Sequence, residues 1–209
     1  MRAALVLATR NPGKLAELRA ILAGILPPEQ VASAGELGLQ DVRETGVTFA
    51  ENALLKARAV VAETGAIALA DDSGLAVDVL GGAPGIFSAR WAGRHGDDGA
   101  NIDLLLAQLA DIPPTHRQAA FVCAAAMVTP GGAEVVEHGY LRGTLLTERR
   151  GQGGFGYDPI LQPYGYEVST AQMTAEEKNA ISHRGAAFRA LLPQIRRALE
   201  GGITPVAAG

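Results

Sequence analysis

Two groups of polar and charged residues suggest phosphate or metal chemistry. One lies at a junction between a strand and a helix, and the other is a set of acidic residues. The first is Thr9-Arg10-Asn11-Pro12-Gly13-Lys14, which joins an apolar run to a helix start. Backbone N–H groups and the positive end of a helix dipole attract phosphate at such a junction. A P-loop is excluded because Ala8 and Leu15 stand where that motif needs glycine and Ser or Thr. An ordinary strand–turn–helix remains the alternative.

The second is an acidic set made of Glu44, Asp71 and Asp72. Mg²⁺ prefers oxygen ligands and is often held by only one or two protein carboxylates. Asp71 and Asp72 close an apolar strand, where each charge is costly unless it is paired or bound to a metal. Neighbouring strand residues point to opposite faces, so we expect one of the two to face the site. A plain Asp-Asp-Ser-Gly turn is the alternative.

Two further segments carry groups that suit a nucleotide. Residues 153–158 read Gly-Gly-Phe-Gly-Tyr-Asp, and glycines allow a ligand to approach the backbone closely while aromatic rings stack on a base. Lys178 precedes Ser182-His183-Arg184, a helix start with two donors for a carbonyl or a phosphate. A hairpin with packed aromatics and a capped helix with solvated side chains are the respective alternatives.

Lysine usage singles out three positions. Of the 18 basic residues, 15 are Arg and three are Lys, namely Lys14, Lys56 and Lys178. An ammonium is a compact charge that a planar guanidinium does not imitate, so these three positions are candidates for phosphate contacts. Chance survival of three surface lysines explains the composition equally well.

Helix signals predict how these residues are positioned. Asn11 as N-cap and Pro12 at the first helical position start a helix that ends before Pro27-Pro28. Thr48 and Glu51 form a capping-box pattern for a second helix that ends at Gly65, and Thr174 with Glu177 repeats the pattern. We expect two more helices, one over residues 101–109 and one capped by Ser182.

Strand signals complete the fold prediction. Apolar runs predict strands over 3–9 and 66–70, the latter ending in the turn Asp71-Asp72-Ser73-Gly74, with a further strand beginning at Leu75. A hairpin is expected from strands 118–128 and 134–141. Helices and strands alternate at first and antiparallel strands follow, which predicts an α/β fold with a mixed central β-sheet flanked by helices.

Composition narrows the class of protein. With 48% apolar and 19% charged residues, the 209-residue chain is expected to be globular, as a single domain over residues 1–200 with a frayed tail over 201–209. A net charge of −4 argues against nucleic acid as a partner. The single cysteine allows no internal disulfide and favours a reducing compartment, and we find no signal peptide or membrane span. We therefore expect a cytoplasmic protein.

Taken together and in this order, the motifs closely resemble the inosine triphosphate pyrophosphatase family, a Ham-like group that hydrolyses non-standard purine nucleotides. The resemblance covers residues 3 to about 199. It rests on T-x-N-x-x-K (9–14), ETGxTFxENAxxKA (44–57), ADDSGLxVDxLxGxPGxxSAR (70–90), GxGGFGYDP (151–159) and EKNAISHRG (177–185). Trp91 and Leu161 depart from the Tyr and Phe expected there, and both are apolar or aromatic exchanges.

The resemblance implies a role for each matching residue. It implies two lobes with the active site in the cleft between them, a homodimer, and Mg²⁺ bound by Glu44 and Asp72, with Asp72 also the proton acceptor for water. Phosphate contacts are implied for Thr9, Asn11, Lys14, Lys56 and Lys178, and Ser73 lies at the substrate. The base pocket is implied to consist of Phe155, Gly156, Tyr157, Asp158, His183 and Arg184.

These roles predict that ITP, dITP or XTP is cut between the α- and β-phosphates to give the nucleoside monophosphate and pyrophosphate. Donors such as Arg184 would pair with the 6-carbonyl and repel the 6-amino group of ATP. Asp71 is the reserve candidate for the proton acceptor. Two alternatives stay open: a pyrophosphatase or triphosphatase for pyrimidine or other modified nucleotides, and a non-catalytic nucleotide sensor.

Overall fold

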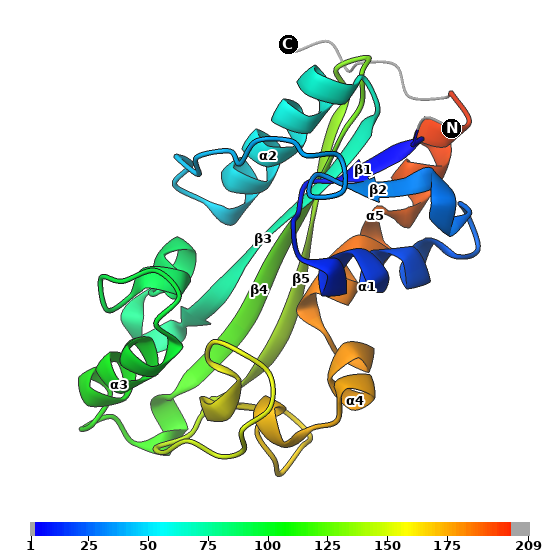
Figure 1. Ribbon diagram of the computed structural model, residues 1–209. Helices are drawn as coiled ribbons and strands as arrows, with labels where there is room; N and C mark the ends of the chain where they lie inside the picture. Colours follow the sequence, from blue (N-terminus) through cyan, green and yellow to red (C-terminus); the bar gives the residue numbers. More distant parts are fainter. Residues whose placement is uncertain (1–2, 202–209) are drawn as a thin grey trace. The chain divides into compact units, whose positions relative to one another are not determined.

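The computed structural model describes residues 3–201 and contains a six-stranded sheet with the strand order β2-β1-β3-β4-β5-β6 (Figure 1). β1 pairs in parallel with both β2 and β3, whereas β5 and β6 are antiparallel. The predicted mixed sheet is therefore confirmed. Its strands are β1 (Leu5–Leu7), β2 (Val31–Ser33), β3 (Ile67–Val77), β4 (Gln118–Val128), β5 (Glu134–Leu145) and β6 (Leu161–Pro163).

Over residues 3–201, five α-helices accompany the sheet, and the predicted caps start three of them. Asn11 caps α1, and Thr48 accepts a hydrogen bond from the backbone N–H of Glu51 at the start of α2. Thr174 and Glu177 form a complete capping box at α4. The helices are α1 (Pro12–Leu22), α2 (Phe49–Thr64), α3 (Asp98–Gln108), α4 (Ala175–Ala180) and α5 (His183–Leu199).

The chain divides into two compact units. Of the described residues, the first unit holds 3–72, 123–139 and 184–201, and the second holds 73–122 and 140–183. β3, β4 and β5 each contribute residues to both units. Residues 202–209, most of the expected C-terminal tail, lie outside the described residues.

In the first unit, helices cover both faces of the sheet. Leu5, Leu7 and Leu69 pack with α1 and α5 in one buried cluster, whereas Val6, Ala68 and Ala70 pack with α2 in another. This alternation is the period of two that a strand imposes on its side chains. The strand order β2-β1-β3 makes the two connections run in opposite directions, so right-handed crossovers place α1 and α2 on opposite faces.

The second unit has its own core. Buried residues of β3, β4 and β5 pack there against α3 and against the segment around Tyr157. The cluster comprises Leu75, Val77, Ile102, Leu105, Leu109, Ala119, Phe121, Leu141, Leu145, Tyr157, Ile160 and Leu161.

The structure corrects several predicted boundaries. The main correction concerns residues 71–74, which form no turn because β3 runs without a break from Ile67 to Val77. The third helix begins at Asp98, three residues earlier than predicted, because Asp97 caps it. α1 ends at Leu22, and β5 extends to Leu145. Asp71 and Asp72 are therefore strand residues with fixed, opposite orientations.

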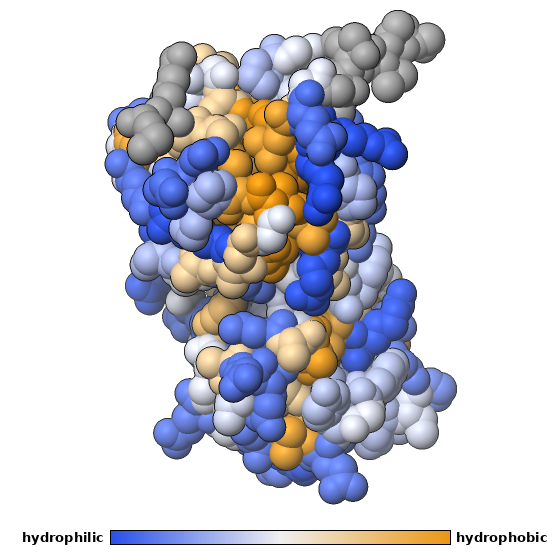
Figure 2. Space-filling model, turned by 90° about the vertical axis from the view of Figure 1, so that its right-hand side faces the viewer, coloured by the Kyte–Doolittle hydropathy of each residue, from blue (hydrophilic) through white to orange (hydrophobic). Residues whose placement is uncertain are grey.

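An apolar groove of about 630 Å³ lies between the C-terminal parts of α1 and α5 in the first unit. Ile21, Ile25, Leu192 and Pro193 line it, and Arg196, Arg197 and Glu200 border it. Figure 2 faces this side and shows apolar residues gathered between hydrophilic ones. None of the helices within residues 3–201 has the length and apolar character needed to cross a membrane.

Candidate active site

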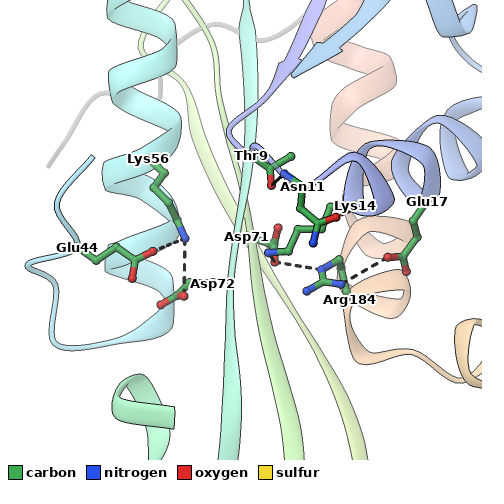
Figure 3. A network of polar contacts seen from close by, with 9 residues as sticks. All are labelled: Thr9, Asn11, Lys14, Glu17, Glu44, Lys56, Asp71, Asp72 and Arg184. Carbon is green, nitrogen blue, oxygen red and sulfur yellow. Dashed lines mark hydrogen bonds and ion pairs between the residues drawn. The ribbon is translucent and has the colours of Figure 1, made fainter. Parts of the chain in front are cut away.

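Asp71 gathers two basic side chains on the face of β3 that carries α1 and α5. Its Oδ2 atom lies 2.9 Å from Nζ of Lys14 and 3.1 Å from Nε of Arg184 (Figure 3). Arg184 also forms an ion pair with Glu17 of α1, at 3.6 Å from Nη1. The Asp71 side chain is only 1% exposed. One buried carboxylate thus holds a cation from each of two helices.

The electrostatics of Asp71 show that it remains ionised. Burial opposes ionisation, but the charges of Lys14 and Arg184 outweigh it and lower the pKa of Asp71 far below its ordinary range. A carboxylate with so low a pKa is a poor proton acceptor near neutral pH. Asp71 therefore suits a role in holding cations, and the reserve role of proton acceptor does not fit it.

Asp72 points to the opposite face, toward α2. Lys56 of α2 places its Nζ atom 2.7 Å from Oε1 of Glu44 and 3.7 Å from Oδ1 of Asp72 (Figure 3). The other Asp72 oxygen accepts a hydrogen bond of 3.1 Å from Nδ2 of Asn52. Glu44 and Asp72, the two residues for which the resemblance implies magnesium binding, thus converge on one ammonium group.

The pKa shifts on this face differ in direction from that of Asp71. Burial raises the pKa of Asp72, and the nearby charges of Glu44 and Asp71 add to the rise, whereas Lys56 and Asn52 lower it in part. Burial lowers the pKa of Lys56, but the charges of Asp72 and Glu44 reverse the direction, and the pKa is raised overall. Of the two adjacent aspartates, Asp72 is the one whose proton affinity suits a general base.

The start of α1 differs from the expectation of unpaired backbone donors. Oδ1 of Asn11 accepts hydrogen bonds from the N–H groups of Gly13 (2.8 Å) and Lys14 (3.3 Å), and Oγ1 of Thr9 accepts one from Asn11 (3.2 Å). Because the cap already satisfies these N–H groups, a phosphate at this end would meet side chains rather than unpaired backbone donors. Arg10 lies away from Lys14 in an exposed ion pair with Asp41.

Asn52 is a site residue that the sequence analysis did not single out. It is 2% exposed, accepts a hydrogen bond of 2.8 Å from the N–H of Gly46 and donates to Asp72. A Cβ atom on Gly46 would lie 2.6 Å from Cβ of Glu51 and 2.7 Å from Oδ1 of Asn52, so only glycine fits there. Asn52 therefore ties the segment that carries Glu44 to the strand that carries Asp72. A polar residue among the apolar positions of a helix was the available signal.

Replacing Asn52 with leucine should lower the free energy of unfolding by about 1–3 kcal/mol, because a partly buried N–H group and a partly buried carboxylate oxygen each lose a partner. Urea denaturation measures the loss. Asn179→Leu, at an exposed position of α4, is the control and should change stability by no more than about 0.5 kcal/mol. Equal losses in both variants would contradict the bridging role of Asn52.

Glu44 and Asp72 fit a magnesium ion by their chemistry. One oxygen of Glu44 and one of Asp72 lie near the ammonium group of Lys56, which balances part of their negative charge. Mg²⁺ prefers such oxygen ligands, is often held by only one or two carboxylates, and completes its coordination shell with water and phosphate. Within residues 3–201 no group of three or more His, Cys, Asp or Glu side chains is arranged to hold a metal. Any metal here would thus depend on these two carboxylates together with ligands from outside the protein.

The remaining candidates belong to the second unit. The Phe155 ring is exposed and lies 4.8 Å from Nζ of Lys178. Tyr157 is buried, donates its hydroxyl hydrogen to the carbonyl oxygen of Ser88 at 3.0 Å, and has its pKa raised by burial. Gly156 donates its N–H to Asp98 at 2.6 Å. Of these predicted base-pocket residues, Phe155 presents its side chain to solvent and Tyr157 serves the core.

Three further predicted residues also belong to the second unit. The His183 ring stacks on Phe121 with centroids 5.3 Å apart. Ser73 follows Asp72 on β3 and is half-buried. Asp158 is buried and forms an ion pair with Lys178.

Comparison with known proteins agrees with this architecture. A dITP/XTP pyrophosphatase of Streptomyces coelicolor is 65% identical over 93% of this chain and 98% of its own length. A dITP/XTP pyrophosphatase of Frankia alni is 58% identical over 93% and 98%. The crystal structure of a nucleoside-triphosphatase, or dITP/XTP pyrophosphatase, from Mycobacterium abscessus superposes with a TM-score of 0.76 at 53% identity, covering 90% of this chain and 98% of that one.

A HAM1 protein from Coxiella burnetii is similar too, with a TM-score of 0.83 at 39% identity over 94% of this chain and 98% of its own. The model of the Ham1 family matches residues 5–194 of this chain. The motifs, the mixed sheet and these similarities lead to one conclusion: the chain belongs to the Ham1 family.

Proposed function

We propose that this protein hydrolyses dITP, ITP and XTP to the nucleoside monophosphate and pyrophosphate, with magnesium as cofactor. Family membership and the names of relatives that are 65% and 58% identical support the substrate class. In this reaction a water oxygen bonds to the α-phosphorus, the bond from that phosphorus to the α–β bridging oxygen breaks, and pyrophosphate leaves.

The observation that carries the proposal is the arrangement of charge around β3. Lys14 and Arg184 meet Asp71 on one face, and Lys56 meets Glu44 and Asp72 on the other. With Glu17 included, this network holds three cations and four carboxylates, so it carries one more negative than positive charge. A polyanionic triphosphate needs further positive charge there, which a divalent cation would supply.

The protein groups divide the chemical work. Asp72 accepts the proton of the attacking water, the role that the family resemblance implies for it, and its carboxylate lies with that of Glu44 beside Lys56. Lys14 and Lys56 lie beside β3 as donors that balance charge on phosphate oxygens. When bound, magnesium adds positive charge at the phosphates and acidifies a water molecule. Asp71 holds the side chains of Lys14 and Arg184 in place through its two ion pairs.

We assign the base to Phe155, which stacks on the purine, and to Arg184, which donates hydrogen bonds to it. Arg184 has five N–H groups, and its ion pairs engage Nε and Nη1. The remaining donors suit the 6-carbonyl of a deaminated purine and oppose the 6-amino group of ATP. A cytoplasmic location and a homodimer remain predictions that come from the single cysteine and from the family resemblance.

Product identification tests the proposal. ITP, dITP, XTP, GTP, ATP and dUTP are incubated separately with the protein and Mg²⁺, and pyrophosphate and orthophosphate are measured in parallel. We expect ITP, dITP and XTP to be cut fastest, with one pyrophosphate released per nucleoside monophosphate. Orthophosphate as the sole first product would exclude cleavage between the α- and β-phosphates, and a preference for dUTP would exclude the purine assignment.

Removing the metal should abolish turnover. Protein treated with EDTA is expected to release no pyrophosphate from ITP, and added Mg²⁺ should restore the rate, because the carboxylates of Glu44 and Asp72 leave the site short of positive charge. Isothermal titration of Mg²⁺ into the nucleotide-free protein gives a second readout, in which Glu44→Gln should weaken binding. Full activity in EDTA would contradict the metal assignment.

A further inference from the structure

Phe155 is largely exposed, although stacking on a base requires its ring to take a defined position. It lies in the glycine-rich segment 151–156 of the second unit and is 68% exposed, so packing against the core does not orient it. An exposed ring on a glycine-rich segment, if nothing else held it, would lose considerable conformational entropy on stacking with a ligand. Some other interaction therefore has to restrict the segment before a ligand binds.

Asp158 supplies that restriction. Its carboxylate is 2% exposed, and Oδ2 accepts a hydrogen bond of 2.8 Å from the N–H of Phe155. The same oxygen forms an ion pair with Nζ of Lys178, and that ammonium lies 4.8 Å from the centre of the Phe155 ring. The carboxylate thus holds the backbone of Phe155, and the ammonium it binds lies at cation–π distance from the ring.

Glycine at position 154 makes this geometry possible. Gly154 has a φ of +74°, and a Cβ atom there would lie 2.0 Å from Oδ2 of Asp158. A side chain would therefore both strain the backbone and displace the carboxylate. The segment is shaped around Asp158.

Thr170 fixes the carboxylate in turn. Thr170 is 1% exposed, and its Oγ1 atom lies 2.8 Å from Oδ1 and 3.0 Å from the backbone oxygen of Asp158. Both neighbours accept hydrogen bonds only, so the hydroxyl group is the donor. By holding Oδ1, Thr170 sets the plane of the carboxylate and directs Oδ2 toward Phe155 and Lys178.

We propose that Thr170 and Asp158 form a positioning pair that presents Phe155 and Lys178 to the substrate, and that Asp158 does not itself contact the base. Both carboxylate oxygens of Asp158 bond to groups of the protein. No motif in the sequence analysis included Thr170. The role in turnover rests on the proposed function, whereas the effect on segment 151–156 does not.

The experiment compares Thr170→Val, which removes the hydroxyl group at nearly constant shape, with Thr170→Ser, which keeps it. Hydrogen exchange of the peptide over residues 153–157 is measured without nucleotide, and kcat and KM are measured with ITP and Mg²⁺. In Thr170→Val we expect the Phe155 amide to exchange about tenfold faster and KM to rise about tenfold, the size of one charge-assisted hydrogen bond. The value of kcat should stay within about threefold, because the lost contact serves binding. Thr170→Ser should resemble the wild type.

Thr129→Val is the matched control. Thr129 is also buried, and its Oγ1 accepts a hydrogen bond of 3.1 Å from the N–H of Ala133 in the first unit. This variant should lose stability without a change in exchange over 153–157 or in KM. Asp158→Asn keeps the shape of the side chain and removes its charge, so it gives a second test if Thr170→Val fails to fold. It should accelerate exchange at Phe155 and raise KM at least as much.

Unchanged exchange and KM in Thr170→Val would overturn the proposal, as would equal effects of Thr170→Val and Thr170→Ser. If the wild type releases no pyrophosphate from ITP, the proposed function fails. The exchange measurements then still decide whether Thr170 orders the segment.

Discussion

Replacing Asp72 with asparagine is expected to lower kcat for ITP about 10³-fold while the protein stays folded. Asparagine has the same shape but cannot accept a proton from water, and it brings no charge to the position shared with Glu44 and Lys56. The amide oxygen can still accept the hydrogen bond from Asn52. Pyrophosphate release gives kcat, and circular dichroism with urea denaturation shows whether the fold is kept.

Asp103→Asn is the matched control for Asp72→Asn. Asp103 lies on α3 in an exposed ion pair with Arg149, and its side chain is 68% exposed. Its replacement should change kcat less than about twofold, because exposed ion pairs contribute little. Nucleotide binding by Asp72→Asn should persist in part, since the three cations remain. A variant that keeps its full kcat would exclude Asp72 as the base.

Local signals predicted the helix starts. Asn11, Thr48 and Thr174 each act within three residues of the sequence, and the structure places all three at the predicted caps. The capping side chain of Glu51 differs in detail, since it accepts from the N–H of Val47 rather than from Thr48. Caps are predictable because their donors and acceptors are neighbours in the chain.

The course of β3 was not predictable from local signals. Asp71-Asp72-Ser73-Gly74 has the composition of a turn, yet it continues the strand. Two long-range interactions decide the outcome: Asp71 meets cations from α1 and α5, and Asp72 meets Lys56 of α2. Because charge pairing compensates the burial of both carboxylates, the strand tolerates them where their composition alone would indicate a turn.

Alternation along the strand predicted that the two aspartates diverge, but it did not show which cations each would meet. That assignment follows from the strand order and from the handedness of the crossovers, which place α1 and α2 on opposite faces. Asn52 belongs to the motif ETGxTFxENAxxKA but received no role, and Thr170 belongs to none of the motifs, for a similar reason. Their partners, Asp72 and Asp158, lie 20 and 12 residues away in the chain.

Replacing Asp71 with asparagine is expected to have a different effect, namely a loss of about 2–3 kcal/mol in the free energy of unfolding. The side chain is 1% exposed and balances Lys14 and Arg184, so its loss leaves two cations close together beside a neutral amide. The partial exposure of Lys14 keeps the loss below that of a fully buried pair. Because Asp72 is intact, kcat at saturating ITP should stay within about tenfold of the wild type.

Urea denaturation with and without pyrophosphate tests this separation of roles. Pyrophosphate should stabilise Asp71→Asn more than the wild type, because the freed charges of Lys14 and Arg184 are then neutralised by the ligand. Asp41→Asn is the matched control: its ion pair with Arg10 is even shorter, at 2.7 Å, but the Asp41 side chain is 82% exposed. Its loss should cost no more than about 1 kcal/mol. If Asp71→Asn instead keeps its stability and loses turnover as completely as Asp72→Asn, Asp71 acts on the reaction itself, and the division of the two aspartates between structure and chemistry is wrong.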